Sequence, residues 1–348
     1  MQSGRKFLWM DVIKVFSTFL IVLQHSISGS FTTLPVDGSE WKVLNGIFMI
    51  SRMGVPVFLM CSGAGILARE HTIREIWRKN ILGLVKVYLG WMAVLGIWDV
   101  LRIWMEGDNA GLRVLVNAFL KCLLFGKYHT WFIFTLLGLY AVTPLLYPIV
   151  QRKELLVYFL GLSLLFTVLL PLFYRIEWLD RALAVADSIH MQFVVGYSLY
   201  FLAGYFICWC MERKWERYAG IVWIVSAAAA YLLSVRDSLQ AGMADHAAYE
   251  IFSPCGFLMS VTLMMLFRKW IGQESASGAL NRAAGLQKHG IAVYLLHVVF
   301  VEAWTKESGM ISVLLAAGIW GLCMAVSMVV YRLPVLGDIL FIRRKKED

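Results

Sequence analysis

The sequence has too little charge and too little polar surface for a soluble protein. Asp, Glu, Lys and Arg make up only 16% of its 348 residues, against about 25% in a typical soluble domain. Hydrophobic residues make up 60% of the chain, and its mean hydropathy is +0.70. A water-soluble globule could not cover so much apolar surface with polar side chains. The composition therefore excludes a soluble enzyme and a disordered chain, and it predicts an integral membrane protein.

Clustered cysteines and linker segments are also missing. The six cysteines stand in apolar or amphipathic stretches, and no pair of them has metal-ligand spacing with a nearby histidine. We therefore expect no disulfide framework and no metal. No Pro-rich or Ser-rich linker interrupts the chain, which predicts one domain over residues 1–348.

Long apolar runs are what the chain does contain. A helix needs about 20 apolar residues to cross a bilayer, and ten segments qualify: 7–28, 43–68, 81–104, 130–150, 155–174, 191–210, 219–236, 250–267, 289–306 and 309–333. They predict an all-α bundle of about ten transmembrane helices. A further stretch at 113–126 is amphipathic but too short and too charged to span. We expect it at the membrane interface or against the bundle.

The net charge of +9 would suit a nucleic-acid partner, but its distribution fits membrane topology better. If the N-terminus is cytoplasmic, the cytoplasmic segments contain nineteen Lys and Arg residues and the opposite loops contain six. Because cytoplasmic loops carry an excess of these residues, we predict that both termini are cytoplasmic and expect no nucleic acid. Asp11, Lys14 and His25 inside the first apolar run argue against a cleaved signal peptide.

These ionisable residues make the first span the leading candidate for function. A Lys or Asp at the bilayer centre costs about 2.5–3.5 kcal/mol on insertion scales. Lys14 and His25 are eleven residues apart, which places them on one helix face roughly 16 Å apart along the axis. Asp11 lies on nearly the same stripe, so the pattern indicates a polar passage through most of the membrane. Alternatively, each side chain could extend separately toward the nearest headgroups.

Basic residues continue into the second and third spans. Arg52 stays charged and needs an anionic partner or water. The segment from Arg69 to Lys79 is a compact basic cluster, followed by Lys86 one turn inside the third span. The cluster could bind the phosphates of a soluble ligand or lipid headgroups, or it could reflect topology alone.

The second span also contains residues that weaken a helix or leave room beside it. Pro56 and the Ser62-Gly63 pair loosen it where a neighbour or a ligand could approach. Gly63 could equally serve only to let two helices pack closely.

Histidines recur in two later spans. His129 begins the fourth span beside Trp131, and an aromatic belt at the interface explains Trp131 but not His129. Tyr294 and His297 are three residues apart on one face of the ninth span. A single histidine there would be a core residue, whereas two or three in one lumen, with His25, predict acid–base chemistry.

Several of these positions form a recognisable series of motifs: Lys14-x10-His25, Val55–Gly63, His129–Leu136, Leu139-Tyr140, Thr143–Leu146 and Gly290–His297. In order and spacing they resemble the acyltransferase-3 family of integral membrane acyltransferases, and within it the bacterial surface-polysaccharide O-acetyltransferases. The resemblance covers nearly the whole chain. The family often has closely spaced arginines followed by proline at the start of the third helix, whereas this chain has Arg74, Arg78 and Lys79 without a proline.

The resemblance implies a membrane O-acetyltransferase of the bacterial cytoplasmic membrane, with acetyl-CoA as donor and a hydroxyl of a cell-surface glycan, or of its lipid-linked precursor, as acceptor. His25 would be the general base, and Lys14 would stabilise the donor or the developing negative charge. The candidate donor-binding residues are Arg52, Arg74, Arg78, Lys79 and Lys86. The candidate channel residues are Asp11, Ser62, His129, Trp131, Tyr294 and His297. Membrane lipids are the other expected partners.

Two alternatives stay open at this point. Ten helices around a charged lumen would also suit a transporter or a flippase of a glycan or lipid intermediate, although the chain has no evident inverted repeat. A sensor or assembly partner without catalytic activity is the second. The sequence carries no signal for the oligomeric state.

Overall fold

The computed structural model describes residues 7–106, 111–175, 191, 194–271, 278–304 and 309–342. These residues form helices and no β-strand, which confirms the all-α prediction. Nine helical stretches among them are long and apolar enough to cross a membrane, and Ser198–Cys210 is a shorter apolar helix. The ten predicted spans coincide with these ten stretches. In the sixth span the helix begins only at Ser198, and residues 192 and 193 lie outside the described part.

The first half of the chain contains α1 Leu8–Thr33, α2 Ser39–Ser51, α3 Gly54–Ile66, α4 Ile73–Glu75, η1 Ile76–Ile81, α5 Leu82–Met105, α6 Leu112–Phe125, η2 Tyr128–Thr130, α7 Trp131–Gln151, α8 Lys153–Leu164, η3 Leu165–Leu169 and η4 Leu170–Arg175. The second half contains α10 Ser198–Tyr205, η6 Phe206–Cys210, η7 Arg213–Tyr218, α11 Ala219–Ala241, η8 Ala247–Tyr249, α12 Pro254–Trp270, α13 Gly278–Gly285, η9 Leu286–His289, α14 Gly290–Trp304, α15 Ile311–Arg332 and α16 Pro334–Leu340.

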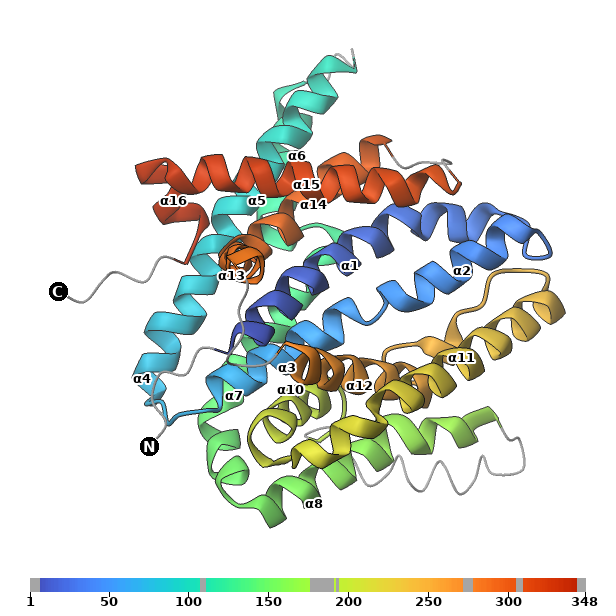
Figure 1. Cartoon of the computed structure of the whole chain (residues 1–348). Coiled ribbons are helices and arrows are strands. Elements are labelled where there is room, and N and C mark those ends of the chain that lie inside the picture. The colour runs from blue at the N-terminus through green and yellow to red at the C-terminus, as the bar shows by residue number, and fades with distance from the viewer. Residues whose placement is uncertain are drawn as a thin grey trace.

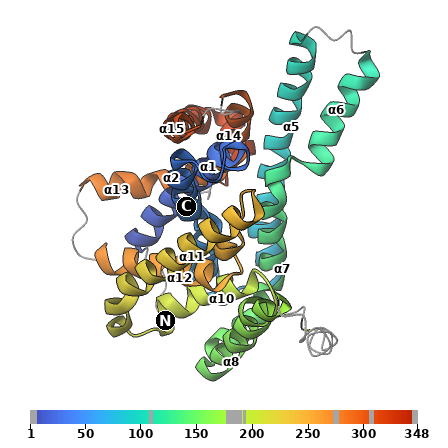
Figure 2. The same cartoon turned by 90° about the vertical axis from the view of Figure 1, so that its right-hand side faces the viewer.

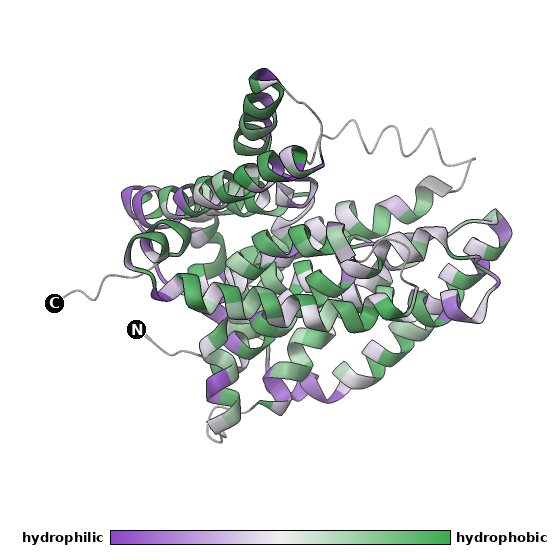
Figure 3. Cartoon of the chain, turned by 90° about the horizontal axis from the view of Figure 1, so that it is seen from above, coloured by the Kyte–Doolittle hydropathy of each residue, from purple (hydrophilic) through white to green (hydrophobic). Residues whose placement is uncertain are grey.

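The outside of the helix bundle is apolar along its helices. Hydrophobic colour runs along the helices and hydrophilic colour gathers at their ends and turns (Figure 3). Large apolar side chains stay well exposed, among them Leu145, Ile221, Leu232, Leu314 and Val329. Lipid tails accept such side chains at no cost, whereas water does not. The chain is therefore a multi-pass membrane protein.

The second predicted span is broken rather than continuous. α2 ends at Ser51 and α3 begins at Gly54, so Arg52 lies in the break. Pro56 has no N–H with which to bond the carbonyl of Arg52 one turn earlier, and this loss favours the break. Gly54 then lets α3 approach α1, because a Cβ at Gly54 would lie 2.9 Å from the carbonyl oxygen of Ser17.

Glycines on α3 and α10 place these two helices in backbone contact. A Cβ on Gly63 would lie 1.9 Å from the carbonyl oxygen of Phe201, and one on Gly204 would lie 1.9 Å from that of Met60. Real Cβ atoms cannot approach so closely, so both positions require glycine. Close packing is therefore the role of Gly63 that the structure supports.

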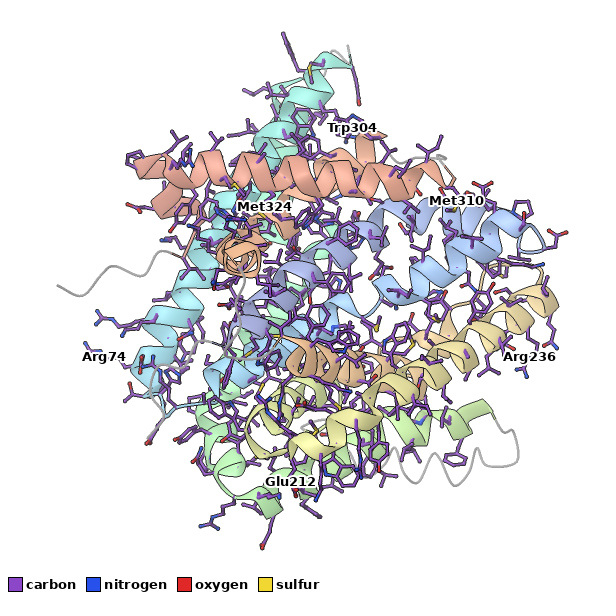
Figure 4. The ribbon with its side chains drawn as sticks, viewed as in Figure 1. Arg74, Glu212, Arg236, Trp304, Met310 and Met324 are labelled. Atoms are coloured by element: carbon purple, nitrogen blue, oxygen red, sulfur yellow. The ribbon has the colours of Figure 1, made fainter. Side chains whose placement is uncertain are left out.

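The bundle has two distinct ends. We call the end where α1 begins and where α4 carries Arg74 the basic end, and the opposite end, where α11 carries Arg236, the far end (Figures 1 and 4). α5 and α6 pack against each other and stand out as a pair from the other helices (Figure 2). Helix α6 is the amphipathic stretch predicted beside the bundle, and it contacts the bundle through α5.

Candidate functional site

Three imidazole rings from three separate helices meet in one place. His25 lies in the second half of α1, His129 in η2 and His297 in the middle of α14. The ring centroids of His25 and His297 are 5.2 Å apart, and those of His129 and His297 are 5.3 Å apart. His25 and His129 are 6.5 Å apart. We call these three residues the imidazole cluster.

Most of the imidazole cluster is closed off from the surface. His297 is 0% exposed and His129 is 1% exposed, while His25 is half-buried. Within the described residues, no ring nitrogen of His129 or His297 bonds another side chain. Backbone carbonyls lie near these rings, that of Leu295 for His129 and those of Val293 and Tyr294 for His297. Buried polar groups are normally well satisfied, and exceptions often mark a functional site. Imidazoles without a side-chain partner beside a half-buried imidazole therefore indicate a place where a substrate proton can be handled.

Two tyrosines border the imidazole cluster. The hydroxyl of Tyr294 donates a hydrogen bond to the carbonyl of His129, and the two rings are 5.4 Å apart. Tyr294 thereby ties α14 to η2. The ring of Tyr128 lies 5.5 Å from that of His25 and is well exposed on its other side. The contact of Tyr128 with His25 became visible only in the structure.

A largely buried ion pair holds the turn that presents His129. Lys127 Nζ donates to Asp99 Oδ1 of α5 at 2.6 Å, and the two side chains are 18% and 13% exposed. The turn begins at Gly126, whose φ of 71° favours glycine. The hydroxyl of Thr130 donates to the carbonyl of Lys127. Asp99 did not figure in the sequence prediction, although a carboxylate inside an apolar run is the same kind of signal as Lys14.

A narrow gap lies along α1 between Lys14 and His25. Its walls are Thr18, Ile21, Phe58, Phe132, Gly290, Ile291 and Tyr294. Thr18 is one turn after Lys14, and Ile21 is one turn before His25. The hydroxyl of Thr18 accepts a hydrogen bond from Trp320 and donates one to the carbonyl of Val15. The walls are therefore mostly apolar, where the sequence predicted a polar passage.

Lys14 and His25 share one face of α1, but they do not share one contact point. The helix is unbroken over both residues, so they are about 16 Å apart along its axis. Lys14 Nζ lies 3.8 Å from Asp11 Oδ1, on the side away from His25. This is the direction in which helical side chains lean. Lys14 and Asp11 therefore lie at the basic-end side of the gap, and His25 lies at its far-end side.

Arg52 lies at the α2–α3 break, apart from the other basic residues. Its guanidinium forms an ion pair with Glu250, and the carboxylate of Glu250 also lies 2.7 Å from His246 Nε2. Arg52 is close enough to His25 to interact with it electrostatically. Its Nε atom has no hydrogen-bond partner within the described residues. Of the five predicted donor-binding residues, Arg52 thus stands apart at the α2–α3 break.

Three predicted donor-binding residues, Arg74, Arg78 and Lys79, do lie together and are exposed at the basic end. They belong to α4 and to the π-helix η1. Glu75 partly neutralises this cluster through contacts with its neighbours: Arg69 at 3.0 Å, His71 at 3.3 Å and Lys79 at 3.6 Å. The side chains of Arg74 and Arg78 are the most available cations of the cluster for an anionic ligand.

Lys86 is committed to the C-terminal helix. Its Nζ donates to the carbonyl oxygen of Asp338 on α16 at 2.5 Å. Trp91 of α5 also donates to α16, to the carbonyl oxygen of Leu340 at 3.0 Å. Lys86 therefore helps to hold α16 against α5.

The two remaining predicted channel residues border the gap and the far end. Ser62 lies one turn after Phe58, whose carbonyl accepts its hydroxyl hydrogen bond. The ring of Phe58 meets that of Phe132 at 5.5 Å. Trp131 is partly exposed and lies 5.4 Å from the ring of Tyr197.

No group of three His, Cys, Asp or Glu side chains within the described ranges is arranged to hold a metal ion.

A family model with the description "Acyltransferase domain", that of the acyltransferase-3 family, matches residues 7–332. This match confirms the resemblance to the acyltransferase-3 family that was inferred from the motifs. No curated protein and no solved structure matches the chain significantly.

Proposed function

The chain belongs to the acyltransferase-3 family of membrane acyltransferases, and from this premise we propose that it moves an acetyl group from acetyl-CoA to a hydroxyl group. The acceptor is a cell-surface glycan or its lipid-linked precursor. The protein lies in the cytoplasmic membrane of a bacterium, with both termini and the basic end facing the cytoplasm. Residues 1–348 act as one domain.

The basic end would bind the donor. The exposed guanidinium groups of Arg74 and Arg78, with Lys79, offer charge-assisted hydrogen bonds to the phosphates of CoA. The slender acetyl-pantetheine arm would then enter the gap beside Lys14. Of the two roles that the sequence allowed Lys14, its distance from His25 favours donor binding over stabilising charge at the reacting carbonyl.

The imidazole cluster would carry out the transfer. His25 accepts the proton of the acceptor hydroxyl as the oxygen attacks the thioester carbon. The carbon–sulfur bond breaks, and the same proton passes to the sulfur of CoA. Arg52, which interacts electrostatically with His25, supplies positive charge beside the oxygen that becomes negative in the transition state.

The acceptor would approach from the far end. His25 is half-buried there, and Tyr128 and Trp131 are partly exposed beside it. Aromatic side chains with a polar tip suit a ligand that presents both hydroxyl groups and apolar ring faces. Membrane lipids surround the remaining surface.

One observation carries the proposal above the others. A narrow apolar gap lies beside α1 between the positions of Lys14 and His25, and three imidazole rings meet one turn beyond its Ile21 wall. A thioester arm that enters from one side of the membrane thus meets a base that an acceptor can reach from the other side.

The test is incubation of the purified protein with radiolabelled acetyl-CoA and fractionated cell-envelope glycans. We expect label in a glycan or lipid-linked glycan fraction, together with release of free CoA thiol. The labelled fraction identifies the acceptor class. Movement of a glycan or lipid across vesicle membranes without consumption of acetyl-CoA would instead identify a transporter or a flippase and overturn the proposal.

A further inference from the structure

Of the other two rings in the imidazole cluster, that of His297 is the closer to His25. The proposed transfer step does not use His297. The two ring centroids are 5.2 Å apart, and the ring planes are inclined by 37°. His297 is 0% exposed, and within the described residues its ring nitrogens bond no other side chain, while the backbone carbonyls of Val293 and Tyr294 on its own helix lie near the ring. A neutral imidazole can donate its N–H to such a carbonyl and still accept a hydrogen bond at its other nitrogen. His297 can therefore hold the neighbouring base.

A general-base histidine needs a second group that fixes which ring nitrogen carries the proton. A carboxylate often has this role and donates no proton itself. In the described part of the chain, His25 forms no ion pair with a carboxylate, and Glu250 is paired with Arg52 and His246 instead. The orienting group must therefore be sought among the neutral side chains.

The polar groups around His25 come from three elements: Tyr128 and His129 from η2, His297 from α14, and Arg52 from the α2–α3 break. Tyr294 of α14 lies behind them, against His129 and His297. Arg52 can only donate hydrogen bonds. The hydroxyl of Tyr294 already donates to the carbonyl of His129. The ring of His129 is farther from that of His25 than the ring of His297 is, at 6.5 Å.

We propose that His297 is the positioning residue of His25. One ring nitrogen of neutral His297 accepts a hydrogen bond from the N–H of His25, so that the opposite nitrogen of His25 faces the acceptor hydroxyl without a proton. For the reaction that His25 performs, this assignment rests on the proposed function. The orientation of the ring itself does not depend on it.

The proton balance of the transfer is unchanged by His297. The hydroxyl proton moves to His25 and then to the sulfur of CoA, which leaves as a thiol. The acceptor oxygen gains its bond to the acetyl carbon as the carbon–sulfur bond breaks. His297 keeps its own proton throughout, and its hydrogen bond stabilises the imidazolium form of His25 while that form exists.

The kinetic test compares three substitutions of His297. His297→Leu has a similar volume and no hydrogen-bonding atom, and we expect a fall in kcat of about 100-fold with the KM for acetyl-CoA unchanged. His297→Asn and His297→Gln each keep one acceptor, at the position of one ring nitrogen or the other. At least one of these two variants should have a kcat about tenfold higher than that of His297→Leu. Equal activity of the Leu variant and wild type would overturn the proposal, as would equal damage in all three variants.

A matched control guards against a general packing effect. His289 is also buried, lies just before α14 and bonds Ser327 through Nδ1 at 2.9 Å, outside the imidazole cluster. We expect His289→Asn to keep the wild-type kcat. A similar loss of kcat in His289→Asn would assign the effect to α14 packing and contradict a specific role for His297.

A spectroscopic test needs neither donor nor acceptor. The chain has seven histidines, so the ring nitrogens of ¹⁵N-histidine-labelled protein can be assigned by comparison with His25→Gln. We expect one tautomer of His25 in the wild type and a mixture of two in His297→Leu. An unchanged tautomer would overturn the positioning role. Absence of acetyl transfer by wild-type protein, with the tautomer shift present, would instead refute the proposed function alone.

Discussion

Lys127 and Asp99 form a 2.6 Å ion pair between the η2 turn and α5, and both side chains are largely buried. The pair fixes Lys127, which lies two positions before His129. Removal of one partner leaves the other charge in an apolar setting, which is more costly than loss of an exposed pair.

We therefore expect Asp99→Asn or Lys127→Gln to destabilise the protein by roughly 2 kcal/mol, between the values for exposed and fully buried pairs. Each single variant should also lower acetyl transfer, because η2 carries His129. The charge swap Asp99→Lys with Lys127→Asp should recover most of the stability. Thermal unfolding in detergent checks this, and single variants as stable as wild type would show that the pair holds nothing in place.

Loss of the proposed base should abolish transfer and leave the fold intact. We expect His25→Ala to lower kcat by at least about 100-fold, because a positioned general base contributes about that much or more to the rate. The neighbouring Gln24→Ala is the control and should keep wild-type activity. Release of CoA thiol measures turnover, and binding of CoA confirms that the variant is folded. Retained turnover in His25→Ala would reject His25 as the base.

The basic end should determine the affinity for the donor. Reversal of charge in Arg74→Glu together with Arg78→Glu should raise the KM for acetyl-CoA by about 10–100-fold, through lost charge-assisted hydrogen bonds and new repulsion. The control Arg236→Glu changes the net charge by as much as either of these single substitutions, but Arg236 lies at the far end of the bundle (Figure 4). It should leave the KM unchanged. An equal effect of Arg236→Glu would show that the cluster acts only through net charge.

Arg52 should affect turnover more than donor binding. In Arg52→Gln we expect kcat to fall by about 10–100-fold, since positive charge next to the reacting carbonyl is lost. The affinity for CoA should change less than about twofold, because Arg52 is paired with Glu250 and lies apart from the exposed arginines that would bind the donor. Calorimetric titration with CoA separates the two effects. If CoA bound more weakly to Arg52→Gln than to Arg74→Glu, Arg52 would be assigned to the donor-binding site and this prediction would be wrong.

The close approach of α3 and α10 should depend on glycine at one position and not at a neighbouring one. A Cβ at position 63 would lie 1.9 Å from the carbonyl oxygen of Phe201, whereas one at Gly65 has nothing within 4 Å. Gly63→Ala should therefore destabilise the protein by roughly 1–3 kcal/mol or more, as overpacking does. Gly65→Ala on the same helix should unfold at the wild-type temperature. Equal melting of the two variants would refute the contact.

Much of the site followed from simple rules applied to single residues. Lys14 and His25 were selected because ionisable groups inside a membrane span are costly, and α1 keeps both on one face as the helical period requires. The prediction for Arg52 grouped it with the donor-binding residues on charge alone. Its anionic partner, Glu250, comes from the approach to α12, almost two hundred residues later, and no local pattern indicates such a pairing.

The sequence by itself determined that the chain is an all-α membrane protein and which polar residues lie inside its spans. Hydropathy and helical period act along a single segment, so they can be read without knowledge of the neighbours. Only the tertiary structure decided that His25, His129 and His297 share one site, that the gap beside Lys14 is mostly apolar, and that Asp99 supports the turn before His129. These relationships depend on how separate helices pack, and packing is set by close contacts such as those at Gly54 and Gly63.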